Sequence, residues 1–280
     1  MTGVKSDRPS WIARLLDFER DGDVFIAPQP PAGPGSRLFG GLVAAQSLAA
    51  AGATVEPDKH PQSLHLYFVR GGEYGVDVEL NVVRTRDGRS FDTRQVTAVQ
   101  NGKTILEMIT SFHRPEEGAD WHPRTAPGIE FEAAVPKSPE LGFADRFEMR
   151  AMPTDDSPFV MPPFWIRTRD RVEDSPLVQA CTLTFMSDIG PVPVARPPGA
   201  PSGTDVGYAA SLDHAVWFHR AFVPHDWHRY EVTPLNNGDS RGLVVGSMYD
   251  RTGSLVASTT QEALWRFASE PIRRAGTLDV

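Results

Sequence analysis

Cysteine is almost absent from this chain of 280 residues, which contains a single thiol, Cys181. One cysteine cannot form an internal disulfide or supply the several thiolates of a cysteine-based zinc site. Such cysteine usage is typical of a reducing compartment, so the expected location is the cytoplasm. Cys181 lies in an apolar, helix-like run and is interpreted as a small core residue, not as a nucleophile.

Long apolar runs and an excess of positive charge are also missing. No window approaches the roughly 18 uninterrupted apolar residues of a membrane span, and the N-terminal segment has no apolar stretch long enough for a signal peptide. We therefore expect neither membrane insertion nor export. The 28 lysines and arginines are outnumbered by 36 acidic residues, a formal charge of −8, so nucleic-acid binding is not expected.

Two common catalytic patterns are absent as well. The G-x-S-x-G turn of a Ser-His-Asp hydrolase does not occur. Four histidines crowd together in the second half, namely His214, His219, His225 and His228. Their spacing does not match the H-E-x-x-H zinc motif, and in a strand the first two would point to opposite faces. Neither a metal nor another cofactor is expected.

The most informative feature that is present is an internal duplication. YFVRGG at Tyr67–Gly72 is similar to WFHRAF at Trp217–Phe222, an offset of 150 (217 minus 67). Gly102 in VTAVQNGKTILEM pairs with Gly253 in GSMYDRTGSLVAS at an offset of 151 (253 minus 102). In both copies a strand-like run, a short turn and a second strand-like run follow one another, which predicts a β-hairpin in each half.

Each copy is preceded by one apolar run of helical length. Leu42–Ala51 is apolar almost all round, as expected for a helix that is buried on most sides, and Gly52 can end it. Leu177–Met186 is similar, with Ser175 as a possible N-cap and Pro176 at the first helical position. Each half is therefore predicted to be one apolar helix followed by antiparallel strands. The Pro- and acid-rich stretch between the halves is predicted to cross a surface as a linker.

On several segments taken together, the chain resembles the acyl-CoA thioesterase II family along most of its length. The segments are RLFGGLVAAQSL (Arg37–Leu48), YFVRGG, RDGRSFDTRQVTAVQNGKTI (Arg86–Ile105), LDHAVWFHRAF (Leu212–Phe222) and SRGLVVGSMYDRTGSLVASTTQE (Ser240–Glu262). The resemblance implies an α+β double hotdog fold, in which two antiparallel sheets are each wrapped around a central apolar helix. It implies an N-terminal hotdog domain over residues 1–113, a linker over 114–163 and a C-terminal domain over 164–280 with the catalytic residues.

The same resemblance implies a function and a set of catalytic residues. Members of the family hydrolyse fatty acyl-CoA to a free acid and coenzyme A, and a homo-oligomer, a dimer or tetramer of double hotdogs, is expected. The water-activating aspartate, threonine and glutamine of the family correspond to Asp188, Ser211 and Gln261 in this sequence. Ser211 keeps the hydroxyl of the threonine but loses the methyl group that restricts rotation about χ1.

The residues themselves agree in part with these roles. Asp188 falls at the C-terminal end of its predicted helix, where the macrodipole disfavours a negative charge and would raise the carboxyl pKa. A solvated acidic cap is the alternative. Strand parity puts Gln261 on the apolar face of its strand, where its amide needs partners. It is equally well read as a core glutamine bonded to the backbone. Ser211 depends on the resemblance alone.

Two substrate contacts are expected from backbone and charge. The oxyanion of the reaction would be met by backbone N–H groups at Gly40 and Gly41, where the first apolar helix begins, or at the second-half equivalent. A basic hairpin offers a possible contact for the phosphates of coenzyme A, although ordinary solvated strand ends explain it better. Its cations are Arg84, Arg86, Arg89, Arg94 and Lys103.

Two other functions remain to be weighed against hydrolysis. An enoyl-CoA hydratase of the same fold would carry a histidine five residues after its aspartate, where this chain has Pro193. A non-catalytic acyl-CoA or lipid binding protein is the second alternative, because Ser211 departs from the family pattern. The first-half counterparts of the three catalytic residues are Gly52, Pro61 and Thr110, so one catalytic site per chain is expected.

Overall fold

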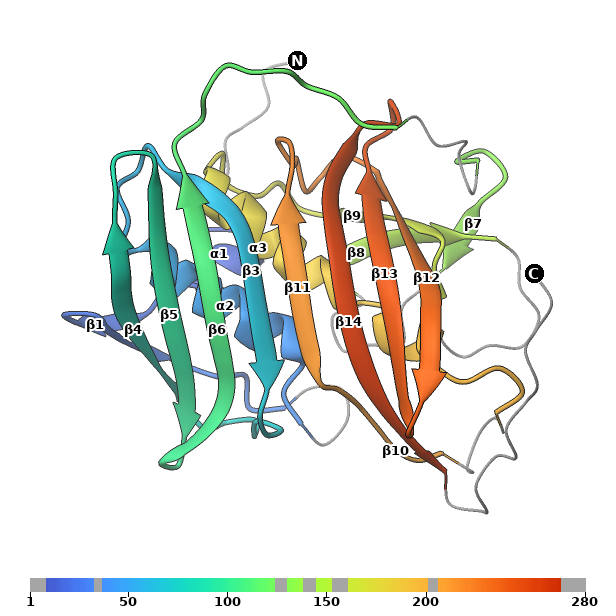
Figure 1. Ribbon diagram of the computed structural model, residues 1–280, viewed down its shortest axis with the longest axis horizontal. Coiled ribbons are helices and arrows are strands. Elements are labelled where there is room, and N and C mark those ends of the chain that lie inside the picture. Colours follow the sequence, from blue (N-terminus) through green and yellow to red (C-terminus); the bar gives the residue numbers. More distant parts are fainter. Residues whose placement is uncertain are drawn as a thin grey trace.

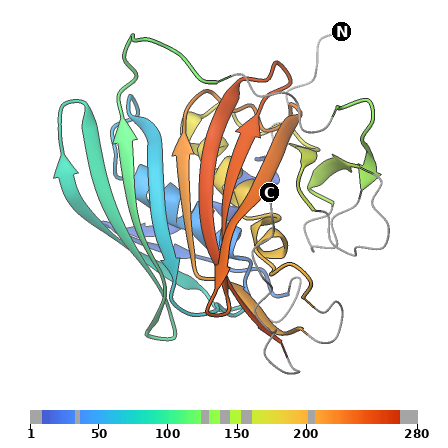
Figure 2. The ribbon, with the colours of Figure 1, turned by 45° about the vertical axis from the view of Figure 1, so that its right-hand side comes forward.

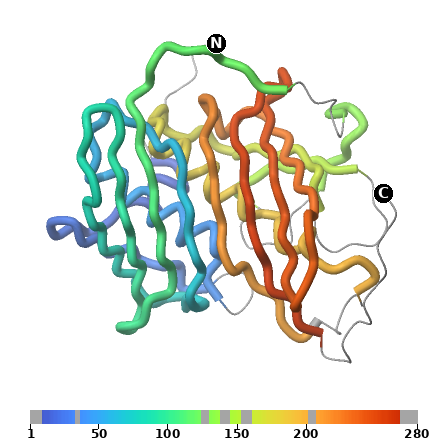
Figure 3. Tube along the Cα trace, in the orientation of Figure 1, coloured from blue at the N-terminus to red at the C-terminus, as the bar shows by residue number. Residues whose placement is uncertain are grey.

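One curved antiparallel sheet organises the protein, with fourteen strands in the part of the chain that the structure describes. The computed structural model describes residues 9–32, 37–123, 130–137, 145–152, 161–200 and 206–267. Within them the strands pair in the order β1-β2-β4-β5-β6-β3-β11-β14-β13-β12-β9-β8-β7, and β10 pairs with β14. The sheet curves around two helices (Figures 1 and 2). The first half of the chain, in blue and green, lies beside the second half, in orange and red (Figure 3).

The first half shows how strand parity and turn chemistry shape the sheet. Its elements are α1 (Trp11–Leu15), β1 (Glu19–Asp21), β2 (Val24–Ala27), α2 (Gly40–Gly52), β3 (His60–Phe68), β4 (Val78–Asp87), β5 (Phe91–Gln100) and β6 (Lys103–His113). On β5, Val96 and Ala98 are buried, whereas Gln95 is exposed and Thr97 is half-buried. Asn101 and Gly102 both have positive φ, as a two-residue hairpin turn requires. The predicted hairpin is confirmed.

The second half repeats this plan and adds strands at the sheet edge. Its elements are β7 (Val135–Lys137), β8 (Phe147–Ala151), β9 (Phe164–Thr168), α3 (Pro176–Ser187), α4 (Pro191–Val194), β10 (Val206–Ser211), β11 (Asp213–Phe218), β12 (His228–Gly238), β13 (Arg241–Tyr249) and β14 (Leu255–Phe267). Strands β7 and β8 lie in the stretch predicted to be a surface linker. Phe147 and Met149 of β8 are buried in the core, so this stretch also contributes to the hydrophobic interior.

The two central helices pack side by side in opposite directions. A Cβ added to Gly41, at the start of α2, would meet the carbonyl oxygen of Phe185 at 2.7 Å. At the other end, a Cβ on Gly52 would lie 2.4 Å from Leu177, at the start of α3. The two glycines therefore let the helices approach closely. This antiparallel packing places the C-terminus of α3 against the N-terminus of α2.

The two halves join through a pair of adjacent strands. Strands β3 and β11 are antiparallel, with Ser63 opposite Trp217 and Tyr67 opposite Asp213. Since α2 belongs to the first half and α3 to the second, the helices and the strand pair bring the same two halves together. No helix in the described part of the chain is long and apolar enough to cross a membrane.

Candidate active site

Asp188 lies at the meeting point of the two central helices. It is the residue that follows the last turn of α3, and it is buried, with 8% of its surface exposed. Its Oδ2 accepts a hydrogen bond of 2.7 Å from the backbone N–H of Gly41, in the first turn of α2. The carboxylate therefore sits at the negative end of one helix dipole and at the positive end of another. It is not the solvated acidic cap that was the alternative interpretation.

Gln261 and Ser211 reach the same carboxylate from two paired strands. Gln261 on β14 donates from Nε2 to Asp188 Oδ1 at 3.0 Å and to Ser211 Oγ at 2.7 Å. The Gln261 side chain is buried, and its described partners are side chains, not backbone atoms. Ser211 ends β10, which pairs with β14. The three residues named from the sequence are thus brought together in one hydrogen-bonded group.

Burial decides the protonation of this group. Burial raises the pKa of Asp188 to about 7, against the lowering effects of its hydrogen bonds with Gln261, Gly41 and Ser211. The sequence-based argument expected a raised pKa from the dipole of the helix that Asp188 ends. The larger cause is removal from water, which disfavours the charged form. A carboxyl group with this pKa can act as a general base near neutral pH.

A histidine and a serine that the sequence did not connect with the site lie beside it. His214 on β11 is 1% exposed, and its Nε2 lies 2.8 Å from the hydroxyl of Ser187, the residue before Asp188. Tyr230 donates to the Ser187 carbonyl at 2.8 Å and lies 2.9 Å from the Thr259 hydroxyl. Burial lowers the pKa of His214 to about 4, so the ring is neutral near pH 7. The signal in the sequence that could have indicated this was the position of His214, three residues after Ser211.

Gly40 and Gly41 lie where the sequence placed them, at the N-terminus of α2. The Gly41 N–H donates to Asp188 Oδ2 and so holds the carboxylate in place. A Cβ on Gly40 would come within 2.9 Å of Asp188 Oδ2 and 2.8 Å of the Phe68 ring. A side chain larger than hydrogen at this position would therefore crowd the carboxylate.

A cavity of about 980 Å³ leads to this group. Gly40 and Ser211 line it, together with apolar side chains of both halves such as Val43 and Leu264. Arg37 and Tyr208 line it as well, and both are exposed. The cavity has the size and the apolar lining of a small-molecule site that ends at a few polar groups.

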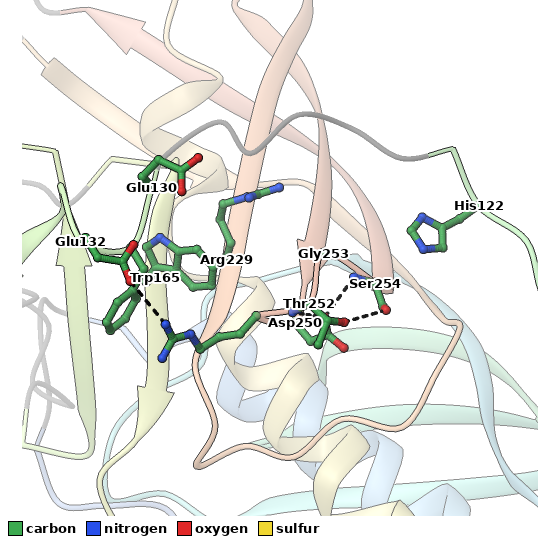
Figure 4. A pocket seen from close by; sticks show the side chains of 11 residues that line it. His122, Glu130, Glu132, Trp165, Arg229, Asp250, Thr252, Gly253 and Ser254 are labelled. Carbon is green, nitrogen blue, oxygen red and sulfur yellow. Dashed lines mark hydrogen bonds and ion pairs between the residues drawn. The ribbon is translucent and has the colours of Figure 1, made fainter.

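A second cavity, of about 530 Å³, is lined by other residues of the second half and is shown in Figure 4. Its polar groups largely satisfy one another. Asp250 accepts from the backbone N–H groups of Thr252 and Ser254, and Arg251 lies 3.5 Å from Glu132. None of the three residues around the Asp188 carboxylate lines it, so the larger cavity is the one that fits the site.

The other residues considered from the sequence, the basic hairpin and Cys181, are not part of this site. Arg84 pairs with Asp23 at 2.7 Å and the buried Arg94 pairs with Asp87 at 2.5 Å, so these two cations of the basic hairpin already have partners. Cys181 is fully buried, and burial raises the pKa of its thiol. Across the described ranges, no three metal-binding side chains cluster in a way that would hold an ion.

Comparison with known proteins identifies the family. Residues 28–113 match the acyl-CoA thioesterase N-terminal domain, and residues 123–265 match the acyl-CoA thioesterase C-terminal domain. The chain is 33% identical over 258 residues to acyl-coenzyme A thioesterase 8 of Mus musculus, covering 82% of this chain and 80% of that protein. The chain belongs to the acyl-CoA thioesterase II family.

Other members of the family and of the fold agree with this assignment. Acyl-CoA thioesterase 2 of Haemophilus influenzae is 28% identical over 285 residues, which cover 94% of this chain and 99% of that protein. The crystal structure of acyl-CoA thioesterase II TesB2 from Mycobacterium marinum superimposes with a TM-score of 0.80 at 32% identity, over 92% of this chain and 99% of that one. A hot dog fold protein from Alicyclobacillus acidocaldarius, at 16% identity and a TM-score of 0.72, is similar in fold. The predicted double hotdog fold is confirmed.

Proposed function

We propose that this protein hydrolyses fatty acyl-CoA thioesters to a free fatty acid and coenzyme A. The observation that carries the proposal is the buried Asp188, hydrogen-bonded to Gln261 at 3.0 Å, beside a cavity of about 980 Å³. A carboxyl with a pKa of about 7 is half ionised at neutral pH, which suits a group that takes a proton from water. The relatives named acyl-CoA thioesterases give the class of substrate.

In the proposed reaction, Asp188 removes a proton from a water molecule as the water oxygen attacks the thioester carbonyl. Gln261 and Ser211 stabilise the carboxylate by hydrogen bonds, and Ser211 Oγ, which accepts from Gln261, keeps a second lone pair that can accept from the water. The tetrahedral oxyanion collapses with loss of the coenzyme A thiolate, which takes up the proton. No bond forms between the acyl group and the protein. We expect the Gly40 N–H to stabilise the oxyanion, because the Gly41 N–H holds Asp188.

Three further properties belong to the same proposal. We infer an N-terminal hotdog domain over residues 1–113, a linker over 114–163 and a C-terminal domain over 164–280. Separate family matches to residues 28–113 and 123–265 support two domains, and the second match includes most of the linker. The protein would act in the cytoplasm, as its single buried cysteine suits. It would assemble as a homo-oligomer.

The experiment that tests the function is release of free thiol from a series of acyl-CoAs, from C2 to C18, by the purified protein. Release above the rate without protein supports hydrolysis. Saturable binding without release would favour the alternative, a non-catalytic acyl-CoA or lipid binding protein. Ser211 is the reason to consider this alternative, because it stands where the family has threonine. Without the threonine methyl group its hydroxyl rotates more freely and would hold a water less firmly.

A further inference from the structure

The exposed part of the larger cavity carries two guanidinium groups that face no carboxylate. Arg37 and Arg70 line this cavity, and neither forms an ion pair with any of the described residues. Arg70 donates from Nη1 to the Thr104 carbonyl at 2.9 Å. Glu73 is the single acid among the described lining residues. In a chain with a formal charge of −8, this part of the cavity is locally cationic and suits an anionic ligand.

The Arg37 side chain is held in place by its surroundings. A Cβ on Gly71 would lie 2.2 Å from Arg37 Cδ, so the missing side chain of Gly71 provides the space for the arginine stem. The guanidinium lies 5.7 Å from the centre of the Tyr208 ring, and Nη1 is 3.4 Å from the Tyr208 hydroxyl. These contacts fix the stem and leave other N–H groups for a ligand.

We propose that Arg37, assisted by Arg70, binds the phosphate groups of the coenzyme A portion of the substrate. The proposal rests on the proposed hydrolysis of acyl-CoA and adds the residues that recognise the nucleotide end. A planar guanidinium suits bidentate hydrogen bonds to phosphate oxygens. The cavity continues from Arg37 to Ser211 and Gly40, so a ligand held at the arginine extends toward the Asp188 carboxylate.

Calorimetric binding of coenzyme A, dephospho-coenzyme A and pantetheine tests the proposal, because pantetheine lacks all the phosphates. We expect Arg37→Ala to weaken coenzyme A binding roughly tenfold and to leave pantetheine binding unchanged. If the variant also binds dephospho-coenzyme A more weakly, Arg37 contacts the diphosphate. If it binds dephospho-coenzyme A as the wild type does, Arg37 contacts the 3′-phosphate. The control is Arg84→Ala, whose arginine already pairs with Asp23, and it should bind all three ligands normally.

Equal weakening for coenzyme A and pantetheine would overturn the proposal, as would unchanged coenzyme A binding in the Arg37 variant. Both outcomes are independent of turnover, since the ligands contain no thioester. A protein that binds coenzyme A through Arg37 but releases no thiol from acyl-CoA would contradict the proposed hydrolysis alone.

A different observation concerns His214, which lies directly across from Gln261 in the sheet. On β11 and β14, Ala215 is opposite Thr260, so the next position along each strand sets His214 opposite Gln261. Both side chains are 1% exposed. They therefore meet on the inner face of the sheet, beside the carboxylate of Asp188.

One hydrogen-bonding position is left open on each of these two side chains. Nδ1 of His214 and Oε1 of Gln261 are buried and lack an aligned hydrogen-bond partner within the described structure. The two Nε2 donors of Gln261 are directed at Asp188 and Ser211, so its Oε1 needs a donor. The Ser187 hydroxyl lies 2.9 Å from the Thr184 carbonyl and 2.8 Å from His214 Nε2, so its one proton can go to either acceptor. The unmet acceptor Oε1 of Gln261 favours the arrangement in which this proton goes to Nε2 and the ring proton stays on Nδ1.

We propose that His214 is a positioning residue that donates from Nδ1 to Oε1 of Gln261 and so fixes the orientation of the amide. With this orientation the amide Nε2 faces Asp188. The reversed amide would set Oε1 against the carboxylate, where two acceptors repel each other and favour the protonated acid. His214 therefore acts on Asp188 through Gln261 and keeps part of the carboxylate in its basic form.

The test compares His214→Leu with His214→Asn, because an asparagine amide keeps a donor near the position of Nδ1. We expect His214→Leu to lower kcat roughly tenfold with KM within a few fold, and to raise the apparent pKa of the pH–rate profile by about one pH unit. The asparagine variant should have a kcat and an apparent pKa close to those of the wild type. Among the described residues, the ionisable side chains beside Asp188 are His214 and Tyr230. Burial lowers the pKa of His214 to about 4 and raises the pKa of Tyr230, so neither is charged between pH 6 and 9.

An unchanged pH profile in His214→Leu would overturn this second proposal, as would an asparagine variant as impaired as the leucine variant. Ser187→Ala provides a further check if the leucine variant does not fold, because it keeps the ring and removes its hydroxyl partner. It should raise the apparent pKa in the same direction, and an unchanged value would contradict the network. If the protein has no turnover, the pKa of Asp188 is read from the pH dependence of the Tm.

Discussion

At the scale of the residue, Asp188 experiences opposing effects on its proton. Burial raises its pKa to about 7, while Gln261, Gly41 and Ser211 stabilise the carboxylate. The base form therefore increases as the pH rises through about 7. We predict that the hydrolysis rate follows this form, rising from pH 5 and reaching a plateau above pH 8. A rate that falls across this range, measured with a saturating acyl-CoA, would contradict Asp188 as the base.

The same pKa predicts an effect on stability. The folded pKa of Asp188 lies above the value of about 4 for an unfolded chain, so its contribution is fully present below pH 4 and is lost as the pH rises through about 7. Asp188→Asn, which cannot ionise, should thus have a higher Tm than the wild type at pH 8.5 and a smaller advantage at pH 5. Scanning calorimetry at both pH values measures this. A lower Tm for the variant at pH 8.5 would mean that the carboxylate stabilises the fold.

The sequence predicted some of these residues better than others. Asp188, Ser211 and Gln261 were named from local motifs that resemble a family, and the structure places all three in one hydrogen-bonded group. His214 was weighed only as a metal ligand, because its contact with Ser187 depends on how a helix end meets a strand. A tertiary contact of this kind leaves no periodic signal in the sequence.

At the scale of the element, the antiparallel pair α2 and α3 creates the site. The apolar runs predicted both helices within two residues of their observed ends, because an apolar surface on nearly all sides has few other stable placements. Their relative direction was not predicted. This direction brings the positive end of α2 to Asp188, and it depends on how the two helices pack. Strands β7 and β8 were missed, since they are short strands within a stretch rich in proline and charge.

The close approach of the helices makes a testable difference between two glycines. Gly41→Ala would place a Cβ 2.7 Å from the backbone oxygen of Phe185, which cannot move without displacing α3. We predict a loss of about 1–3 kcal/mol in the free energy of unfolding, together with a lower hydrolysis rate because the Gly41 N–H shifts from Asp188. Urea unfolding and thiol release measure the two effects.

Gly52→Ala is the matched control at the other end of α2. The atoms nearest to its Cβ would all belong to the side chain of Leu177, which can adjust at low cost, and the site lies roughly 18 Å away along a helix of this length. This variant should keep its hydrolysis rate. Equal losses of rate in both variants would contradict a specific role of the α2 N-terminus.

At the scale of the whole molecule, neither half of the duplication has a complete site. The second half supplies Asp188, Ser211 and Gln261, and the first half supplies the N-terminus of α2. In the first half, the residue that follows α2 is Ala53, one position from the predicted counterpart Gly52. Thr110, opposite Gln261 in the duplication, donates to the Ser63 carbonyl, and Pro61 has no hydroxyl. The first copy has no base.

This asymmetry predicts one ligand per chain. A non-hydrolysable acyl-CoA analogue should bind with a stoichiometry of one in calorimetry, and its carbonyl should lie beside Asp188 in a crystal structure of the complex. The first half would act as a scaffold and as one wall of the cavity. Two equivalent analogues per chain, one of them with its carbonyl beside Thr110, would contradict this assignment.

The most direct test of the account is the turnover of Asp188→Asn with a fatty acyl-CoA that the wild type hydrolyses. Asparagine keeps the size of the side chain but cannot accept a proton from water. The account predicts a fall in kcat of roughly 10²- to 10⁴-fold, with binding of the non-hydrolysable analogue within a few fold of the wild type. A kcat near the wild-type value would remove Asp188 from the chemistry and contradict the account.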